Sequence, residues 1–145
     1  MDWLLWLHIG SYGAALLIML AFAITYATRS QFMPYHAEAL NRPWHALDAH
    51  LQLLLLALIR LLGWGWLTIA CAGAVMLYQV VTLDLPLQLL VLLQGFCLLA
   101  VTPIIAVSSQ VKRLTNSSPP ISATWLIVML TWLGFLFGLL ARMQH

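Results

Sequence analysis

The long apolar runs of this chain decide what it can fold into. The first extends from Trp3 to Ala27, 25 residues without an Asp, Glu, Lys or Arg. At about 1.5 Å rise per residue, a helix of that length crosses a hydrocarbon core of about 30 Å. The whole chain is 63% hydrophobic and 7% charged, whereas soluble domains are roughly 45–50% apolar and 25% charged. The sequence therefore predicts an integral membrane protein.

Three further apolar runs predict three more spans. The run from Leu47 to Val81 is too long for one crossing without extreme tilt, and Gly63 and Gly65 allow a bend just after Arg60. A polar turn is expected from Ser108 to Pro120. We therefore expect a single all-α membrane domain, with four transmembrane helices and a helical cytoplasmic loop between the first two. The spans are predicted at about 3–27, 63–81, 85–107 and 121–141.

Basic residues near the span ends predict the orientation. Of the six Lys and Arg residues, all but Arg142 lie in the first and third loops: Arg29, Arg42, Arg60, Lys112 and Arg113. Lys and Arg resist translocation, so these loops should be cytoplasmic and both termini periplasmic, in an inner membrane. Basic residues this dilute do not indicate a nucleic-acid partner. The expected partners are the lipid bilayer and another membrane protein or a second copy of the chain.

The loop between the first two spans is predicted to be helical. Pro34 favours the start of a short helix, and Asn41 suits its left-handed end. Pro43 favours the start of a second helix that continues into the next apolar run. His36, on the first of these helices, is expected to face solvent.

One constellation in this loop could bind a metal. His45, Asp48 and Gln52 lie at positions i, i+3 and i+7 of the expected second helix, which predicts a polar stripe. A carboxylate beside an imidazole suits a metal site, so His45 and Asp48 are the candidate metal residues. A third ligand is missing, because His50 lies five positions after His45 and does not share its helix face. The alternative, which we favour, is the solvated face of an interfacial helix.

His8 is the candidate cofactor-binding residue. It lies two turns into the first span, and an ionisable residue at membrane depth is a functional candidate by default. Haem held by two histidines needs a second ligand at a similar depth, and the predicted second to fourth spans contain no histidine. The alternative is a hydrogen bond at the outer interface, to Tyr78, Gln79, Gln88 or a water molecule.

Three residues are candidates for interaction by packing or at the membrane surface. Gly134 and Gly138 form a GxxxG pattern in the fourth span, which lets helices approach closely within the bundle or against a partner. Arg60 precedes Trp64 and Trp66, a pattern typical of the membrane interface. Its guanidinium is expected to reach a lipid phosphate or water there.

The stretch from Phe32 to Leu67 resembles a group of small four-span bacterial membrane proteins. The shared features are a Phe-Met-Pro-Tyr-His motif at 32–36, Trp44, and Arg60 followed by Gly63. The resemblance covers about a quarter of the chain and implies a four-span protein of a bacterial inner membrane. It implies no specific activity.

A second, more distant resemblance rests on two short motifs. The sequences WLHIG at 6–10 and YHAEA at 35–39 are similar to those of the small haem-associated protoporphyrinogen oxidases of bacteria. This resemblance implies functional roles for His8 and for an arginine before a Tyr-His pair. Here Arg29 lies seven residues before His36, and the basic residues expected in the later spans are absent.

The sequence contains no recognisable catalytic constellation, and no catalytic residue is assigned. We therefore expect a non-catalytic subunit, or a helix-packing partner, of a membrane complex, without a cofactor. The alternative from a different class is a haem-linked membrane oxidoreductase that uses His8 and the histidines of the first loop.

Overall fold

The computed structural model describes residues 3–144, and within that range it contains helices joined by short segments and no strand. The elements in chain order are α1 (Trp3–Ala27), α2 (Pro34–Leu40), a 3₁₀ turn (Trp44–Ala46), α3 (Ala49–Thr82), α4 (Leu87–Thr115) and α5 (Ile121–Arg142). Helices α1, α3, α4 and α5 are each long and apolar enough to cross a membrane. The prediction of an all-α, multi-pass membrane protein with four candidate spans is confirmed.

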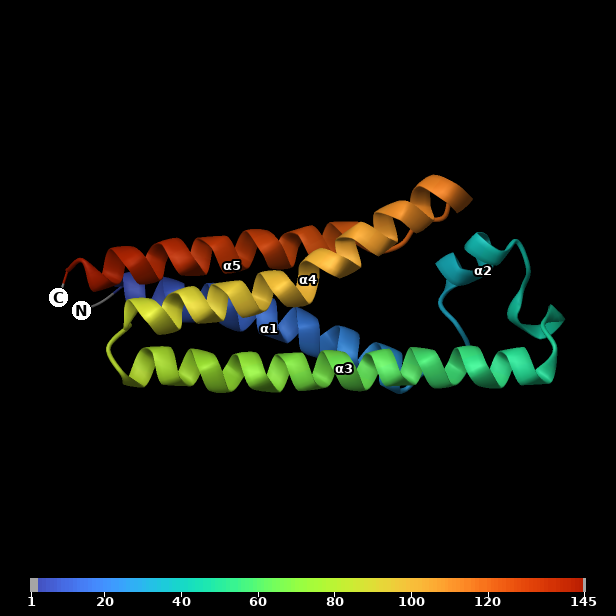
Figure 1. Ribbon diagram of the computed structural model, residues 1–145, viewed down its shortest axis with the longest axis horizontal. Helices are drawn as coiled ribbons and strands as arrows, with labels where there is room; N and C mark the ends of the chain where they lie inside the picture. Colours follow the sequence, from blue (N-terminus) through green and yellow to red (C-terminus); the bar gives the residue numbers. More distant parts are fainter. Residues whose placement is uncertain (1–2, 145) are drawn as a thin grey trace.

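The four long helices form an elongated bundle (Figure 1). Helix α1 packs against α3 and α5, and α4 packs against α5 and α3. We call the end where α1 begins and α5 ends the terminal end, and the opposite end, where α2 lies, the loop end (Figure 1). Fully buried side chains come from all four long helices, among them Tyr12, Met19, Val80, Leu90, Leu93, Val101 and Ile127.

Three helix ends lie where the sequence predicts them. Helix α2 begins at Pro34, whose fixed φ and missing N–H suit the first helical turn. It ends before Asn41, which adopts the left-handed conformation with φ 49°. Helix α1 ends at Ala27, at the limit of its apolar run.

The prediction of a bend in the second long helix is wrong. Helix α3 runs without interruption through Gly63 and Gly65, and at about 1.5 Å per residue its 34 residues span roughly 51 Å. A Cβ added at Gly63 would collide with the backbone of Ala27, so this glycine permits the close approach of α1 and not a bend. The first turns of α3 extend beyond the end of α1 (Figure 1).

The prediction that a second helix of the loop starts at Pro43 and continues into the next span is also wrong. A 3₁₀ turn from Trp44 to Ala46 is followed by Leu47 and Asp48 in extended conformation. The Asp48 side chain accepts hydrogen bonds from the main-chain nitrogens of His50 and Leu51, each at 3.0 Å. Asp48 is therefore the N-cap of α3. The preference of Asp for this position outweighs the continuation of one helix from Trp44 into α3.

The predicted polar turn begins later than expected. Helix α4 continues through Ser108 to Thr115 and ends before Asn116, which has φ 54°. Lys112 and Arg113 lie in its last turn, where positive charge interacts favourably with the helix dipole. The helix also continues through Pro103, and its C-terminal part leans away from α3 (Figure 1). This lean separates the helices at the loop end.

Candidate functional site

His8 is fully buried between helices. Its Nδ1 lies 2.8 Å from the main-chain oxygen of Gly134 on α5. A carbonyl oxygen only accepts, so Nδ1 donates, and in the neutral ring Nε2 is an acceptor. Nε2 is buried and has no hydrogen-bond partner in the described chain. The predicted partners Tyr78, Gln79 and Gln88 are wrong.

Tyr12 and Gln94 extend this buried polar cluster to α4. The Tyr12 hydroxyl donates to Gln94 Oε1 at 2.7 Å, and the rings of His8 and Tyr12 meet edge to face with centroids 5.2 Å apart. The Gln94 Nε2 atom is buried without a partner in the described residues. The cluster therefore links α1 to α4 and α5 within the apolar core.

Gly134 and Gly138 pack inside this chain. A Cβ added at Gly134 would lie 2.5 Å from Tyr12 Cδ2, and one at Gly138 would lie 2.6 Å from His8 Nδ1. Both glycines thus make room for the ring side chains of α1. Of the two uses that the sequence left open for the GxxxG pattern, packing within the bundle is the one observed.

The surroundings of His8 do not fit a haem ligand within this chain. An axial histidine presents a free nitrogen to a space that holds a flat macrocycle. The His8 Nε2 has no hydrogen-bond partner in the described chain, and an Nδ1 bond to a carbonyl oxygen is usual in metal-ligating histidines. The ring is nevertheless fully buried, and a Cβ at Gly138 would collide with it, so the packed helices leave no accessible space beside it. The ring acts as a packing element between α1 and α5.

The candidate metal residues of the loop do not form the predicted stripe. His45 lies in the 3₁₀ turn and is exposed, whereas Asp48 caps α3. Gln52 Nε2 donates to the main-chain oxygens of Trp44 and Leu47, at 2.9 and 3.0 Å. Among residues 3–144, no group of three or more His, Cys, Asp or Glu side chains is placed to hold a metal ion.

His36 is half-buried, contrary to the expectation that it faces solvent. Its Nδ1 accepts a hydrogen bond from the Met33 main-chain nitrogen at 3.2 Å, which closes the first turn of α2. Burial lowers the pKa of His36 below its ordinary value of 6.5. The neutral ring is therefore favoured, because a protonated Nδ1 could not accept this bond.

Two further contacts hold α2 against the bundle. The Tyr35 hydroxyl is hydrogen-bonded to that of Tyr26 on α1. Burial, together with this hydrogen bond, raises the pKa of Tyr35. The Glu38 carboxylate accepts from the Ser118 main-chain nitrogen at 2.9 Å, in the segment before α5. Helix α2 is thus docked and is not a free surface segment.

The exposed side chain of Arg60 has a specific hydrogen-bond partner. Its Nε and Nη2 donate to the main-chain oxygen of Arg29, at 3.3 and 3.2 Å. That oxygen lies just beyond the end of α1, so the contact joins α3 to the first residues of the loop. The side chain is exposed, and its position at the membrane interface stays a prediction.

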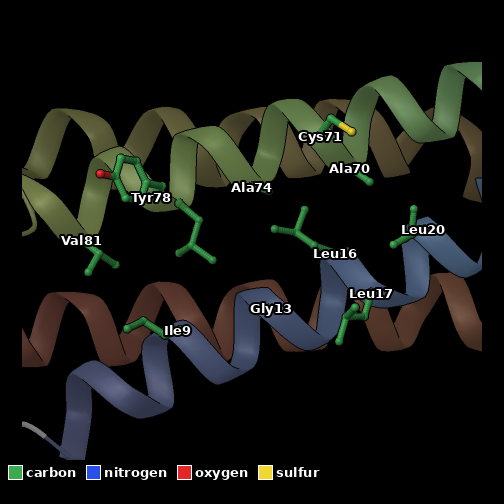
Figure 2. A pocket seen from close by; sticks show the side chains of 11 residues that line it. Ile9, Gly13, Leu16, Leu17, Leu20, Ala70, Cys71, Ala74, Tyr78 and Val81 are labelled. Carbon is green, nitrogen blue, oxygen red and sulfur yellow. The ribbon is translucent and has the colours of Figure 1, made fainter.

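An apolar groove lies between α1 and α3 (Figure 2). It encloses about 520 Å³, and its floor includes the small residues Gly13, Ala70 and Ala74. In Figure 2 the Leu16 side chain points from α1 toward α3, where a Cβ added at Gly73 would lie 2.5 Å from Leu16 Cδ2. We call this feature the α1–α3 groove.

Comparison with models of protein families, with curated proteins and with solved structures finds no match for this chain. Sequence reasoning identified His8, Gly134 and Gly138 but missed that they contact one another. It also missed Gly73 and the groove beside it. The available signal for this groove was a cluster of small residues in one stretch of helix, Ala70, Gly73 and Ala74.

Proposed function

We propose that this protein is a non-catalytic component of a membrane complex, and that a transmembrane helix of another protein packs into the α1–α3 groove. The α1–α3 groove is the observation that carries this proposal. It runs along the middle of α1 and is apolar, and Gly13 and Ala74 leave room there for an approaching helix. In a bilayer, helix association depends on such close packing, because lipid already satisfies apolar surface.

A second copy of the chain is a poorer occupant for this surface. A two-fold symmetric pair presents the same patch on both subunits, so one concave groove would face another. That arrangement leaves the space at Gly13 and Ala74 unfilled. A convex helix of another protein fills it and contacts both walls.

Site-specific photocrosslinking tests this proposal. A photoreactive amino acid at Ala74 should crosslink to one discrete protein in native membranes, and the Gly13→Leu variant should abolish that product. The matched control carries the same amino acid at Val75, the next residue of α3, which is 58% exposed and does not line the groove. Crosslinks to lipid alone, or only to a second copy of this chain, would contradict the proposal.

The orientation and the membrane are part of the same proposal. The basic residues of the loop end support a cytoplasmic position for it, in a bacterial inner membrane, with both termini periplasmic. A periplasmic reporter fused after His145 should be active, as should a cytoplasmic reporter fused near Asn116. The reverse pattern would overturn the orientation.

A haem-linked oxidoreductase is the less supported alternative. The His8 ring is fully buried and closely packed, with no accessible space beside it for a macrocycle, which favours a packing role for this residue. A Soret band in the purified protein would support the alternative and contradict the assignment of His8 to packing.

A further inference from the structure

A second cavity lies at the loop end, under α2. It has a volume of about 340 Å³, and its walls come from α1 to α5. Pro103 lines it on α4, and the C-terminal part of α4 leans away from α3 (Figure 1). We call this cavity the α2 chamber. Tyr35 and His36 of the docked helix α2 line one side of it.

His36 supplies a hydrogen-bond donor to the chamber wall. Because its Nδ1 accepts from the Met33 nitrogen, the neutral ring carries its proton on Nε2. No residue in the described chain is hydrogen-bonded to that Nε2 atom. The ring therefore keeps one N–H available to a ligand.

Hydroxyl groups supply the other donors. Tyr26 and Tyr35 share one hydrogen bond, which uses only one of their two protons, so one O–H stays available. Ser108 lines the chamber from α4. The described residues that line the chamber include no Asp, Glu, Lys or Arg. A buried ionic ligand would have no opposite charge there, so the lining suits a neutral group with acceptor oxygens.

The wall of the chamber offers aromatic surface to a ring, and its volume limits the size of a ligand. Phe22 and Trp66 line it as a stacked pair, with centroids 5.6 Å apart and planes 23° apart. Small-molecule sites enclose roughly 300–1,000 Å³, and the chamber lies at the small end of that range. It therefore has room for a single-ring head group and not for a whole lipid.

A third cavity adjoins the chamber and has a different character. It also measures about 340 Å³ and shares Tyr26, His36 and Leu62 with the chamber. Its other walls are apolar and include Leu55 and Leu58 of α3. The side chain of Leu58 is 53% exposed, so this cavity opens toward the surface of the bundle and can receive an apolar chain.

We propose that the two cavities together bind a membrane quinone. The ring lies in the α2 chamber beside Trp66, and its carbonyl oxygens accept hydrogen bonds from His36 Nε2, Ser108 and the free tyrosine hydroxyl. The apolar tail lies along Leu55 and Leu58. This site is separate from the α1–α3 groove, so the proposal does not depend on a partner helix.

Fluorescence quenching of the full-length protein in phosphatidylcholine nanodiscs tests the proposal. Quinones quench tryptophan emission on contact, so titration with decylubiquinone should give a saturable decrease. The Trp66→Phe variant should lose the saturable part and keep the ring stack with Phe22. The matched Trp64→Phe variant should retain it, because Trp64 is 61% exposed and does not line the chamber.

A second pair of variants tests the hydrogen bonds of the head group. Ser108→Ala should weaken the apparent Kd about threefold to tenfold, the effect of one lost hydrogen bond. Ser109→Ala, at the neighbouring position outside the lining, should leave it unchanged. This pair decides the question even where Trp66→Phe lowers the yield of folded protein. Quenching that never saturates, or decanol competing as strongly as the quinone, would overturn the proposal.

Discussion

The Nδ1 atom of His8 lies 2.8 Å from the main-chain oxygen of Gly134, although 126 positions separate the two residues. The contact joins α1 to α5 in the interior of the bundle, beside the Tyr12–Gln94 hydrogen bond. It is accompanied by a second close approach one turn along α5, where Gly138 makes room for the same ring. His8 is therefore part of the packing between two helices.

Removal of the His8 ring should lower the stability of the bundle. We expect His8→Ala to reduce the free energy of unfolding by about 2–4 kcal/mol, because it leaves a cavity and loses the bond to Gly134. Unfolding by SDS in bicelles measures this loss. His45→Ala is the control, since His45 is exposed in the loop. A silent His8→Ala would show that the ring does not hold α1 to α5.

The glycines of α5 and α4 should respond in opposite directions to the same substitution. In Gly138→Ala the new Cβ would lie 2.6 Å from His8 Nδ1, and we expect a loss of about 1–3 kcal/mol from the displaced ring. Gly95→Ala meets nothing within 4 Å and should stabilise α4 by about 0.5–1 kcal/mol, because alanine favours the helix. Equal effects of the two variants in the unfolding assay would contradict this packing.

Arg60 should tolerate lysine better than leucine. Its two hydrogen bonds to the Arg29 oxygen are long and exposed, so Arg60→Lys should cost less than about 1 kcal/mol. Arg60→Leu leaves the oxygen without this donor and removes a charge from the loop end, and should cost more. Thermal unfolding in nanodiscs of anionic lipid compares the two variants. A large loss with lysine alone would mean that the planar guanidinium has a further, buried acceptor.

Docking of α2 should weaken in mild acid. Burial lowers the pKa of His36 below 6.5, so the undocked loop binds the proton more readily than the docked one. The stabilisation is complete above that value and is lost as the pH falls through it toward the lowered pKa. Hydrogen exchange of the α2 amides, corrected for intrinsic rates, measures this opening between pH 8 and pH 5.

Two variants separate His36 from its neighbours in that experiment. His36→Gln should remove the pH dependence, whereas His45→Gln should leave it unchanged. Glu38 also holds α2, by accepting from the Ser118 main-chain nitrogen, so Glu38→Gln shows how much of the docking depends on that contact. Unchanged pH dependence in His36→Gln would show that another group controls docking.

Local signals predicted much of the fold, and the exceptions have physical causes. Proline and asparagine mark the two ends of α2 because each restricts or permits one backbone conformation. Asp48 could belong to a polar stripe on a helix or could be the N-cap of one. Its spacing from His45 and Gln52 alone does not distinguish these two roles. Gly63 likewise allows a bend or a close approach, and only the position of α1 decides between these.

The candidate sites were less predictable because the spans are apolar on every side. A helix with one apolar face reveals which side packs inward, but a helix that is apolar all round does not. The pairing of His8 with Gly134 depends on how α1 and α5 are rotated against each other. The α1–α3 groove and the α2 chamber depend in the same way on helix crossings and on the lean of α4. No local pattern contains that information.

The central claim is that a helix of a partner protein lies in the α1–α3 groove. The size at which the protein migrates, after extraction from its native membrane in mild detergent, tests this claim most directly. The wild type should migrate on a native gel as part of a larger complex. Ala74→Leu fills the groove and should release the chain from that complex, whereas Val75→Leu adds apolar volume just outside the groove and should leave the complex intact. Migration of the wild type as a lone chain, or equal behaviour of the two variants, would contradict the claim.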